Sequence, residues 1–336
     1  MSDLIAEIDR IAIDSRFSGA VRVDRHGDLL AEAAYGWADR AHLVANSVDT
    51  RFGIASGAKG FTALTVMRAV ETGALELATT ARSLLGPDLP LIDAAVTVEH
   101  LLAHRSGIGD YLDEEVAGDI RDHLMPVPVH ELASTESYLR VLDGHHHKFA
   151  PGTAFAYCNG GYVLLALLLE RATGTAFHDL VQRSVCDPAA LRCTAYLRSD
   201  ELPGDAAIGY LEVDGLRSNV LHLPVLGSGD GGIFSTVGDV SSLWTALFEG
   251  GLVSAATVAA VVQPRSTALD SASRYGLGFW LHATTDAVML EGYDAGVSFR
   301  SVHSPSSGLT HTVMSNTSEG AWPITRRLDE VLALDM

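Results

Sequence analysis

Short apolar stretches separated by turn residues occupy both ends of the sequence. Residues 18–36 (SGAVRVDRHGDLLAEAAYG) hold two such stretches around His26-Gly27-Asp28, a pattern typical of a hairpin. Toward the other end, four more strand-like runs are broken by Gly, Asp, Ser and Pro. These runs are YGLGFWLHAT, AVMLEG, VSFRSVHS and LTHTVMSN. We predict that the six segments share one antiparallel sheet.

Helical periodicity dominates the middle of the chain. Residues 98–107 (VEHLLAHRSG) and 160–174 (GGYVLLALLLERATG) are examples, and Gly174 has the character of a helix stop. Residues 1–13 alternate acids with spaced apolar side chains, which predicts an amphipathic helix at the start.

The order of these elements predicts an α+β fold. An antiparallel sheet is flanked by N- and C-terminal helices and carries an inserted, mostly helical lobe. A chain of 336 residues is long enough for two cores, because single cores stop growing near about 250–300 residues. We expect residues 1–78 and 206–336 to form the sheet domain and residues 79–205 the helical lobe. The active site is expected in the cleft between them.

The charge balance narrows the classes of partner. The chain has 23 Lys and Arg against 42 Asp and Glu, a formal net charge of -19, so its field repels nucleic acid and anionic membrane surfaces. Residues 1–13 have neither a basic nor a continuous apolar region, and the longest apolar run, residues 162–169, is far shorter than a membrane-spanning helix. The three cysteines form no Cys-x-x-Cys pair, which fits a reducing compartment. A cytoplasmic location is expected.

The segment FGIASGAKGFTALTVMRAVETG places Ser56 before a helical pattern, with Lys59 three residues later. On a helix this spacing puts both side chains on one face. A neutral Lys59 amine there could accept the Ser56 proton, and the helix end would favour an oxyanion. The chain has only two lysines, Lys59 and Lys148, beside 21 arginines, and arginine cannot be deprotonated. General drift toward arginine with an N-capping Ser56 explains the same pattern.

Tyr157 and Asn159 stand just before the apolar helix, after Pro151 and Gly152. A loop fixed in this way is a good platform for a phenol and an amide. Tyr157 is a candidate for proton transfer, and Asn159 for orienting Lys59 and the substrate. A turn with a capping Asn159 and a half-buried tyrosine is the alternative.

Three other features are weaker candidates. Residues 227–232 (GSGDGG) satisfy the dinucleotide fingerprint but lack a surrounding βαβ pattern. Residues 145–147 are three histidines, for which a solvated loop is favoured over a metal site. His104 and Ser106 suggest a Ser–His pair, but a structural role in a turn is favoured. No metal site and no cofactor are expected.

Four segments together carry a family resemblance: Ser56-Gly57-Ala58-Lys59, Tyr157-Cys158-Asn159, residues 101–111 (LLAHRSGIGDY) and the ERATG helix end. In this order they resemble the penicillin-recognising serine hydrolases, particularly the class C β-lactamase, DD-peptidase and family VIII esterase group. The resemblance covers residues 50–316. It implies a helical lobe beside an antiparallel sheet. By the same resemblance, the Gly-rich residues 227–232 lie along the cleft wall.

The third motif of that family is Lys or His, a small residue and Gly, on a strand that lines the cleft. The best match here is Asp294-Ala295-Gly296. An anion thus replaces the family's cation, which disfavours recognition of a substrate carboxylate. Arg300 lies close in sequence and could supply a positive charge. With this alignment, the N–H groups of Val297 and Ser56 form the oxyanion hole.

The sequence therefore predicts a serine hydrolase that acts on a small-molecule ester, amide or lactam through an acyl-enzyme, with Ser56, Lys59 and Tyr157 as catalytic residues. Asn159, Asp294, Gly296 and Val297 are the predicted substrate-binding residues. An esterase or small amidase ranks above a β-lactamase, and both rank above a DD-peptidase. The alternative is a non-catalytic protein that keeps the cleft as a surface for a ligand or partner.

Overall fold

A computed structural model describes residues 2–114, 118–266 and 273–332 of the chain. The longer helices and the α-helical turns are α1 Ser2–Asp14, α2 Ala58–Glu71, α3 Ala81–Leu85, α4 Val98–Leu102, α5 Leu139–Leu142, α6 Asn159–Thr173, α7 Phe177–Val181, α8 Val237–Phe248, α9 Ala255–Val261 and α10 Ala321–Leu332. The short 3₁₀ turns are η1 Ala55–Gly57, η2 Ile120–Asp122, η3 Val129–Glu131 and η4 Thr135–Tyr138, and the π-helical turn is η5 Gln182–Cys186. The strands are β1 Gly19–Arg25, β2 Asp28–Tyr35, β3 Trp37–Asp39, β4 Val44–Ala45, β5 Phe52–Gly53, β6 Ala195–Tyr196, β7 Ile233–Ser235, β8 Ser273–Tyr275, β9 Trp280–His282, β10 Val288–Asp294, β11 Val297–Ser304 and β12 Leu309–Ser315.

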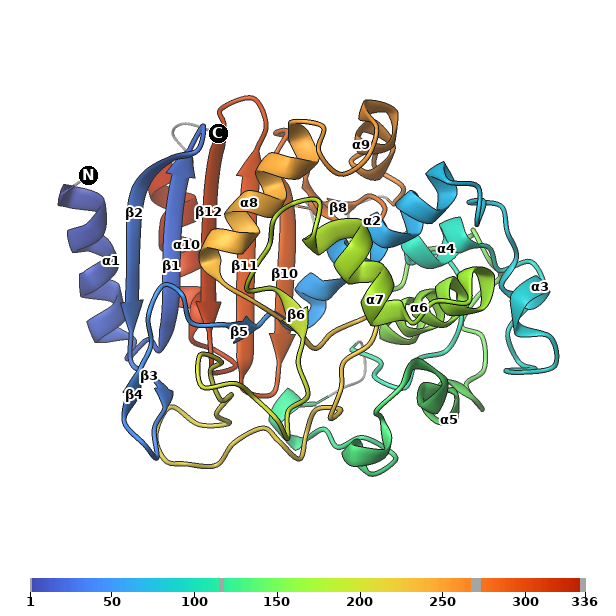
Figure 1. The fold of residues 1–336 in the computed structure, drawn as a ribbon, viewed down its shortest axis with the longest axis horizontal. Coiled ribbons are helices and arrows are strands. Elements are labelled where there is room, and N and C mark those ends of the chain that lie inside the picture. Colours follow the sequence, from blue (N-terminus) through green and yellow to red (C-terminus); the bar gives the residue numbers. More distant parts are fainter. Residues whose placement is uncertain (1, 115–117, 267–272, 333–336) are drawn as a thin grey trace.

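A seven-stranded antiparallel sheet has the order β2-β1-β12-β11-β10-β9-β8 (Figure 1). The predicted α+β fold and its shared antiparallel sheet are confirmed. The segment YGLGFWLHAT gives parts of two strands rather than one, because the Gly276 N–H donates to the Phe279 carbonyl and turns the chain between β8 and β9. Every residue of the central strand β12 is buried, since helices cover both faces of the sheet.

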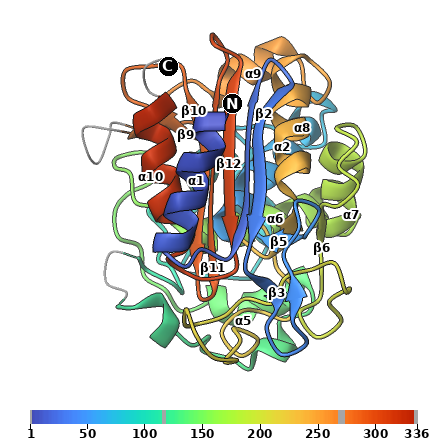
Figure 2. The ribbon, with the colours of Figure 1, turned by 90° about the vertical axis from the view of Figure 1, so that its left-hand side faces the viewer.

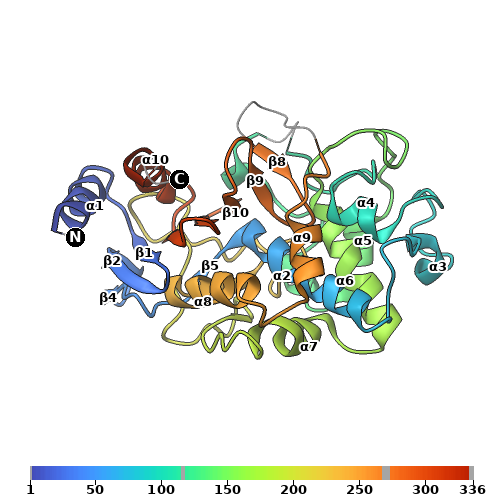
Figure 3. The same ribbon diagram turned by 90° about the horizontal axis from the view of Figure 1, so that it is seen from above.

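Helices α1 and α10 cover one face of the sheet and α8 covers the other (Figures 2 and 3). The apolar side chains of α1 and α10 meet the sheet in one cluster that includes Ile8, Val21, Val313 and Leu328. On the opposite face, Trp244 of α8 is fully buried and donates a hydrogen bond to the Ser301 hydroxyl. A small second sheet, ordered β5-β7-β6, continues toward the helical part.

The helical part lies beside the β8 end of the large sheet (Figure 1). Its central helix α6 is buried from Asn159 to Leu169, as its continuous apolar sequence requires. The helix ends where predicted, at Gly174, which adopts a left-handed conformation with φ 67°. Within the described residues, no helix combines the length and apolarity needed to cross a membrane. The domain boundaries at residues 79 and 205 remain a prediction, since one hydrophobic cluster continues across both.

Candidate functional site

Ser56 lies in the turn η1, which runs directly into helix α2. The residue before it, Ala55, has φ 43°, a value that costs free energy for any residue with a Cβ atom. Strand β10 presses against this turn at Gly292. A Cβ atom at that position would come within 2.0 Å of the Ile54 carbonyl oxygen. The sheet backbone therefore approaches the Ser56 turn as closely as a glycine permits.

Lys59 is 1% exposed and directs its amine at three oxygen atoms. Its Nζ lies 2.8 Å from Ser56 Oγ and 2.8 Å from Asn159 Oδ1. A third contact, of 3.0 Å, joins Nζ to the carbonyl oxygen of Asp230. Among the residues that the structure describes, no carboxylate lies within ion-pair distance of this amine. Helix α2, helix α6 and the Gly-rich loop thus converge on one amine.

The Tyr157 side chain completes this group. Burial raises the pKa of the Tyr157 phenol well above its usual value, and a hydrogen bond with the Ser56 side chain opposes part of the increase. The Lys59 Nζ lies 4.8 Å from the centre of the Tyr157 ring. We call Ser56, Lys59, Tyr157 and Asn159 the Ser56 cluster.

Asn159 is held at the first turn of α6 by a network of acceptors. The Asp110 carboxylate accepts the N–H groups of Asn159 and Gly160, at 2.5 and 2.9 Å. The Asn159 amide nitrogen donates to the Glu114 carboxylate at 3.0 Å. The helix cap is Cys158, not Asn159, because the Cys158 Sγ accepts the Gly161 N–H at 3.3 Å. The Asn159 side chain is therefore free to reach Lys59.

The Gly-rich loop supplies a contact that the sequence analysis missed. Asp230 offers its carbonyl oxygen to Lys59, and its carboxylate accepts the O–H of Tyr111. Desolvation raises the pKa of the Asp230 carboxyl group. A signal was present in the flanking glycines, since a Cβ atom at Gly229 would lie 2.1 Å from the Tyr162 carbonyl oxygen. The absence of a side chain at Gly229 lets the loop pack against α6.

An aromatic group supports Tyr157 from behind. Its ring stacks on Trp280 with centroids 5.9 Å apart and an interplanar angle of 9°. His104 lies on another side, 4.3 Å from the Tyr157 ring, and its Nδ1 accepts the Cys158 N–H at 3.1 Å. Burial lowers the pKa of His104 well below its usual value, so the ring is neutral. His104 thus packs against the cluster and does not contact Ser56 as a base.

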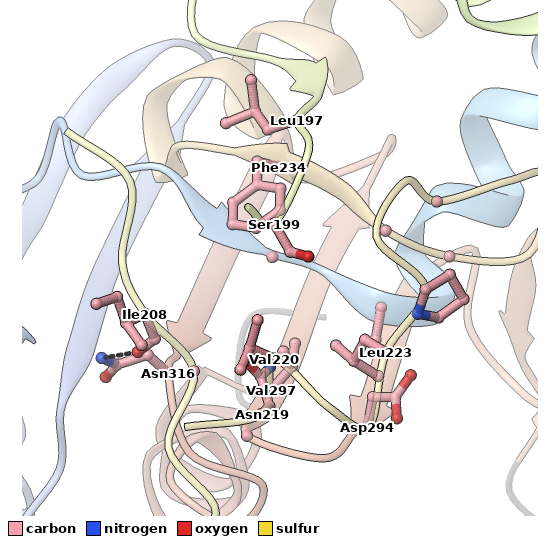
Figure 4. Close-up of a pocket in the computed structure, with 18 of the residues that line it drawn as sticks. Leu197, Ser199, Ile208, Asn219, Val220, Leu223, Phe234, Asp294, Val297 and Asn316 are labelled. Carbon is pink, nitrogen blue, oxygen red and sulfur yellow. Dashed lines mark hydrogen bonds between the residues drawn. The ribbon is translucent and has the colours of Figure 1, made fainter. Parts of the chain in front are cut away.

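A pocket of about 330 Å³ adjoins the Ser56 turn. Asp294, Gly296 and Val297 line it together with Ala55 and Asp230 (Figure 4). The remaining walls are largely apolar and include Leu197, Ile208, Val220, Leu223 and Phe234. We call this cavity the Asp294 pocket.

The Asp294 carboxylate is half-buried at the end of β10. Its described partner is the N–H of the next residue, Ala295, at 2.8 Å. Desolvation raises the pKa of Asp294 to about 7, and the charges of Asp230 and Glu114 act in the same direction. The candidate third motif therefore brings an acid, not a cation, to the cleft.

Arg300 does not provide the missing positive charge. Its guanidinium pairs with Asp329 of α10 at 3.0 Å and with Glu291 at 3.1 Å. Helix α10 covers the face of the sheet opposite α8, so these contacts direct Arg300 away from the Asp294 pocket. The possibility that Arg300 serves the cleft is excluded by its orientation.

The three adjacent histidines have separate structural contacts. The Asp93 N–H donates to His147 Nε2 at 2.9 Å, and the His145 ring contacts the Val141 carbonyl at 3.0 Å. Within the described ranges, no three His, Cys, Asp or Glu side chains are grouped to hold a metal ion. The cysteines Cys158, Cys186 and Cys193 are free thiols, of which Cys193 is partly exposed.

Comparison with known proteins matches residues 5–334 to the family model described as Beta-lactamase. Penicillin-binding protein 4* from Bacillus subtilis (strain 168) is 27% identical over 84% of this chain and 63% of its own length. A D-aminopeptidase from Brucella ovis is 30% identical over 66% of this chain and 41% of its own length. The chain thus spans less than two thirds of these curated relatives.

A solved structure matches the fold closely along its whole length. The penicillin-binding protein from Bacillus halodurans superposes with a TM-score of 0.90 and 34% identity. The match covers 96% of this chain and 99% of that protein. The antiparallel sheet, its covering helices and the helical lobe are therefore those of penicillin-binding proteins.

Proposed function

The chain belongs to the β-lactamase family, and from that premise we propose that it is a serine hydrolase that forms an acyl-enzyme on an ester or amide. The observation that carries this proposal is the Ser56 cluster. A partly exposed hydroxyl lies 2.8 Å from a buried amine at the start of a helix. Such a hydroxyl can lose its proton as it attacks a carbonyl carbon.

We assign Lys59 as the base. The Asn159 Oδ1 and the Asp230 carbonyl oxygen accept hydrogen bonds from the amine. A neutral amine donates one hydrogen to each and keeps its lone pair for the Ser56 proton. Within the described ranges, the hydrogen-bond partners of the amine are neutral oxygen atoms.

Tyr157 suits proton donation better than proton abstraction. Burial raises its pKa, so the neutral phenol is the stable form at neutral pH. A phenol beside Ser56 can pass a proton to the leaving group and then orient the water that hydrolyses the acyl-enzyme. Return of the Lys59 proton to the Tyr157 oxygen then restores both residues, so that the proton lost by Ser56 balances the one given to the leaving group.

The oxyanion of the tetrahedral intermediate is assigned to the backbone N–H groups of Ser56 and Val297. Val297 begins β11 and lies against the Ser56 segment, where a Cβ atom at Gly53 would be 3.5 Å from Val297 Cγ2. Gly296, with φ 70°, makes the turn that brings β11 back along β10. No cofactor takes part in this scheme.

The direct test is covalent labelling. The protein is treated with a fluorophosphonate or a penicillin probe, and the modified peptide is identified by mass spectrometry. We expect the label on Ser56 and its loss in Ser56→Ala, with hydrolysis reduced by about 10⁴-fold or more. A folded protein that stays unlabelled at Ser56, or a Ser56→Ala variant as active as the parent, would remove the mechanism.

A substrate panel separates the subclasses. We rank p-nitrophenyl esters and small amides first, nitrocefin second and a D-Ala-D-Ala peptide last, because the Asp294 carboxylate repels a substrate carboxylate. The D-aminopeptidase name of the Brucella relative supports amide hydrolysis within this family. Turnover of the D-Ala-D-Ala peptide alone would reverse the ranking.

A further inference from the structure

We propose that the Asp294 pocket binds the cationic end of the substrate, an ammonium group a few atoms from the carbonyl that Ser56 attacks. This inference rests on the proposed function and names the substrate class for it. The pocket is lined by Ala55, next to Ser56, and by Asp230, whose carbonyl contacts Lys59. A group bound in the pocket therefore lies next to Ser56 and Lys59.

The charges around the pocket have one sign. The lining side chains include the carboxylates of Asp200, Asp230 and Asp294, and the described lining residues contain no Lys, Arg or His. Asp200 is paired with Arg198 at 2.8 Å, and Asp230 accepts a hydrogen bond from the Tyr111 hydroxyl. Asp294 has a neighbouring backbone N–H and no described cation. Of the three carboxylates, Asp294 is the one whose described partners include neither a cation nor a side-chain hydroxyl.

Two nearby basic side chains, Arg300 and Lys59, have other partners. The Arg300 guanidinium pairs with Asp329 and Glu291 on another face. The Lys59 amine already contacts three oxygen atoms within the Ser56 cluster. A carboxylate removed from water gains most from a positive partner, because apolar walls weaken the competing interaction with solvent. An incoming ammonium group supplies that partner.

The shape of the pocket agrees with this assignment. Asp294 lies at one side of the cavity, with Leu223 beside it (Figure 4). Largely apolar walls with an acidic group at one side suit a short alkyl chain that ends in an ammonium group. Desolvation raises the pKa of Asp294 to about 7, and binding of a cation would favour its ionised form. A substrate with a carboxylate in the same place would meet like charge.

The test uses pairs of p-nitrophenyl esters that differ by one charged group. Glycine is compared with propionate and β-alanine with butyrate, since each pair exchanges an ammonium for a methyl group. The ratio of kcat/KM for the two members is measured in the parent and in Asp294→Asn. Dividing the parent ratio by the variant ratio cancels the intrinsic reactivity of each ester. We expect this double ratio to be about 10 to 100 for at least one pair.

Asp200→Asn is the matched control. It removes a carboxylate from the same pocket, but one that is exposed and paired with Arg198, so its double ratio should stay near 1. A double ratio near 1 for Asp294→Asn, with butyrate still hydrolysed by Ser56, would overturn this inference and leave the proposed function intact. Loss of all ester hydrolysis in the parent would instead overturn the proposed function.

A second experiment tests the inference by measuring binding alone, without substrate hydrolysis. Binding of n-butylammonium is measured by calorimetry on Ser56→Ala and on Ser56→Ala/Asp294→Asn. We expect about tenfold weaker binding in the double variant. Equal binding to both proteins, or no binding to either, would contradict the assignment, and a thermal melt confirms that both variants are folded.

Discussion

The Ser56 cluster and the Asp294 pocket lie side by side but are built differently. In the cluster, a buried amine has three oxygen partners, and the surrounding helices hold each partner in place. In the pocket, a half-buried carboxylate has a backbone N–H and no described cation. The first arrangement is internally complete, whereas the second gains a partner only from outside. The Ser56 cluster is accordingly proposed to carry out the reaction, and Asp294 is proposed to select the substrate.

The largest expected effect comes from replacing the amine of the cluster. Lys59→Arg replaces the proposed neutral amine with a guanidinium that stays protonated, and so removes the ability to accept a proton at neutral pH. We expect kcat/KM for p-nitrophenyl butyrate to fall by about 10³-fold. Lys148→Arg is the matched control, since Lys148 is the second lysine of the chain and pairs with Asp113 at 2.8 Å. Equal activity of both variants in a steady-state assay would show that Lys59 is not the base.

Removing the phenol oxygen should have the next largest effect. Tyr157→Phe keeps the ring that stacks on Trp280 and deletes the proposed proton relay. We expect kcat to fall by about 10²-fold with a smaller change in KM. Tyr275→Phe serves as control, because Tyr275 belongs to the same aromatic group and its hydroxyl makes a long 3.4 Å contact with Tyr162. A Tyr157→Phe variant no slower than the control would assign the relay to another group.

The boundary between the two regions can be disturbed at Gly292. A Cβ atom there would collide with the Ile54 carbonyl, so Gly292→Ala should displace β10 or the Ser56 turn. We expect a loss of about 1–3 kcal/mol in the free energy of unfolding and roughly tenfold slower hydrolysis. Gly204→Ala meets nothing within 4 Å and is the control. Denaturant unfolding and ester kinetics measure both effects, and a Gly292→Ala protein indistinguishable from the control would contradict the close approach.

The smallest expected effect is on the stability of the pocket. The folded-state pKa of Asp294, about 7, lies above its usual value of 3.8, so ionising this group costs stability as pH rises through that window. Asp294→Asn should therefore melt about 3 °C higher than the parent at pH 8, with little difference at pH 4. Calorimetric melts at the two pH values test the sign. A difference that is the same at pH 4 and pH 8 would show that Asp294 ionisation is not responsible.

Local patterns were enough to predict much of the fold. The hairpin at residues 18–36 and the buried helix ending at Gly174 follow from signals within about twenty residues of sequence. The spacing of Ser56 and Lys59 is local in the same sense, because one helical turn separates them. Such patterns predict structure well because they depend on local backbone geometry and not on contacts with distant segments.

The rest of the site depends on contacts between distant segments. Asn159 and Asp230 contact Lys59 across separations of 100 and 171 residues. The periodicity of apolar residues in the sequence does not predict contacts between segments so far apart. Trp280 was not expected beside Tyr157, since it belongs to a short strand, β9, more than 120 residues later in the sequence. The direction of Arg300 was open for a related reason: only the packing of α10 decides which acid it meets. Tertiary packing supplied these details.

The flat contact between Trp280 and Tyr157 has a practical consequence. An indole stacked beside the phenol, with ring centroids 5.9 Å apart, is a built-in optical reporter, because its emission depends on the polarity and quenching groups around the ring. Among the four tryptophans of the chain, Trp280 stacks on a member of the Ser56 cluster. Formation and decay of an acyl group on Ser56 should therefore be visible in stopped-flow fluorescence of the unlabelled protein, even with substrates that carry no chromophore.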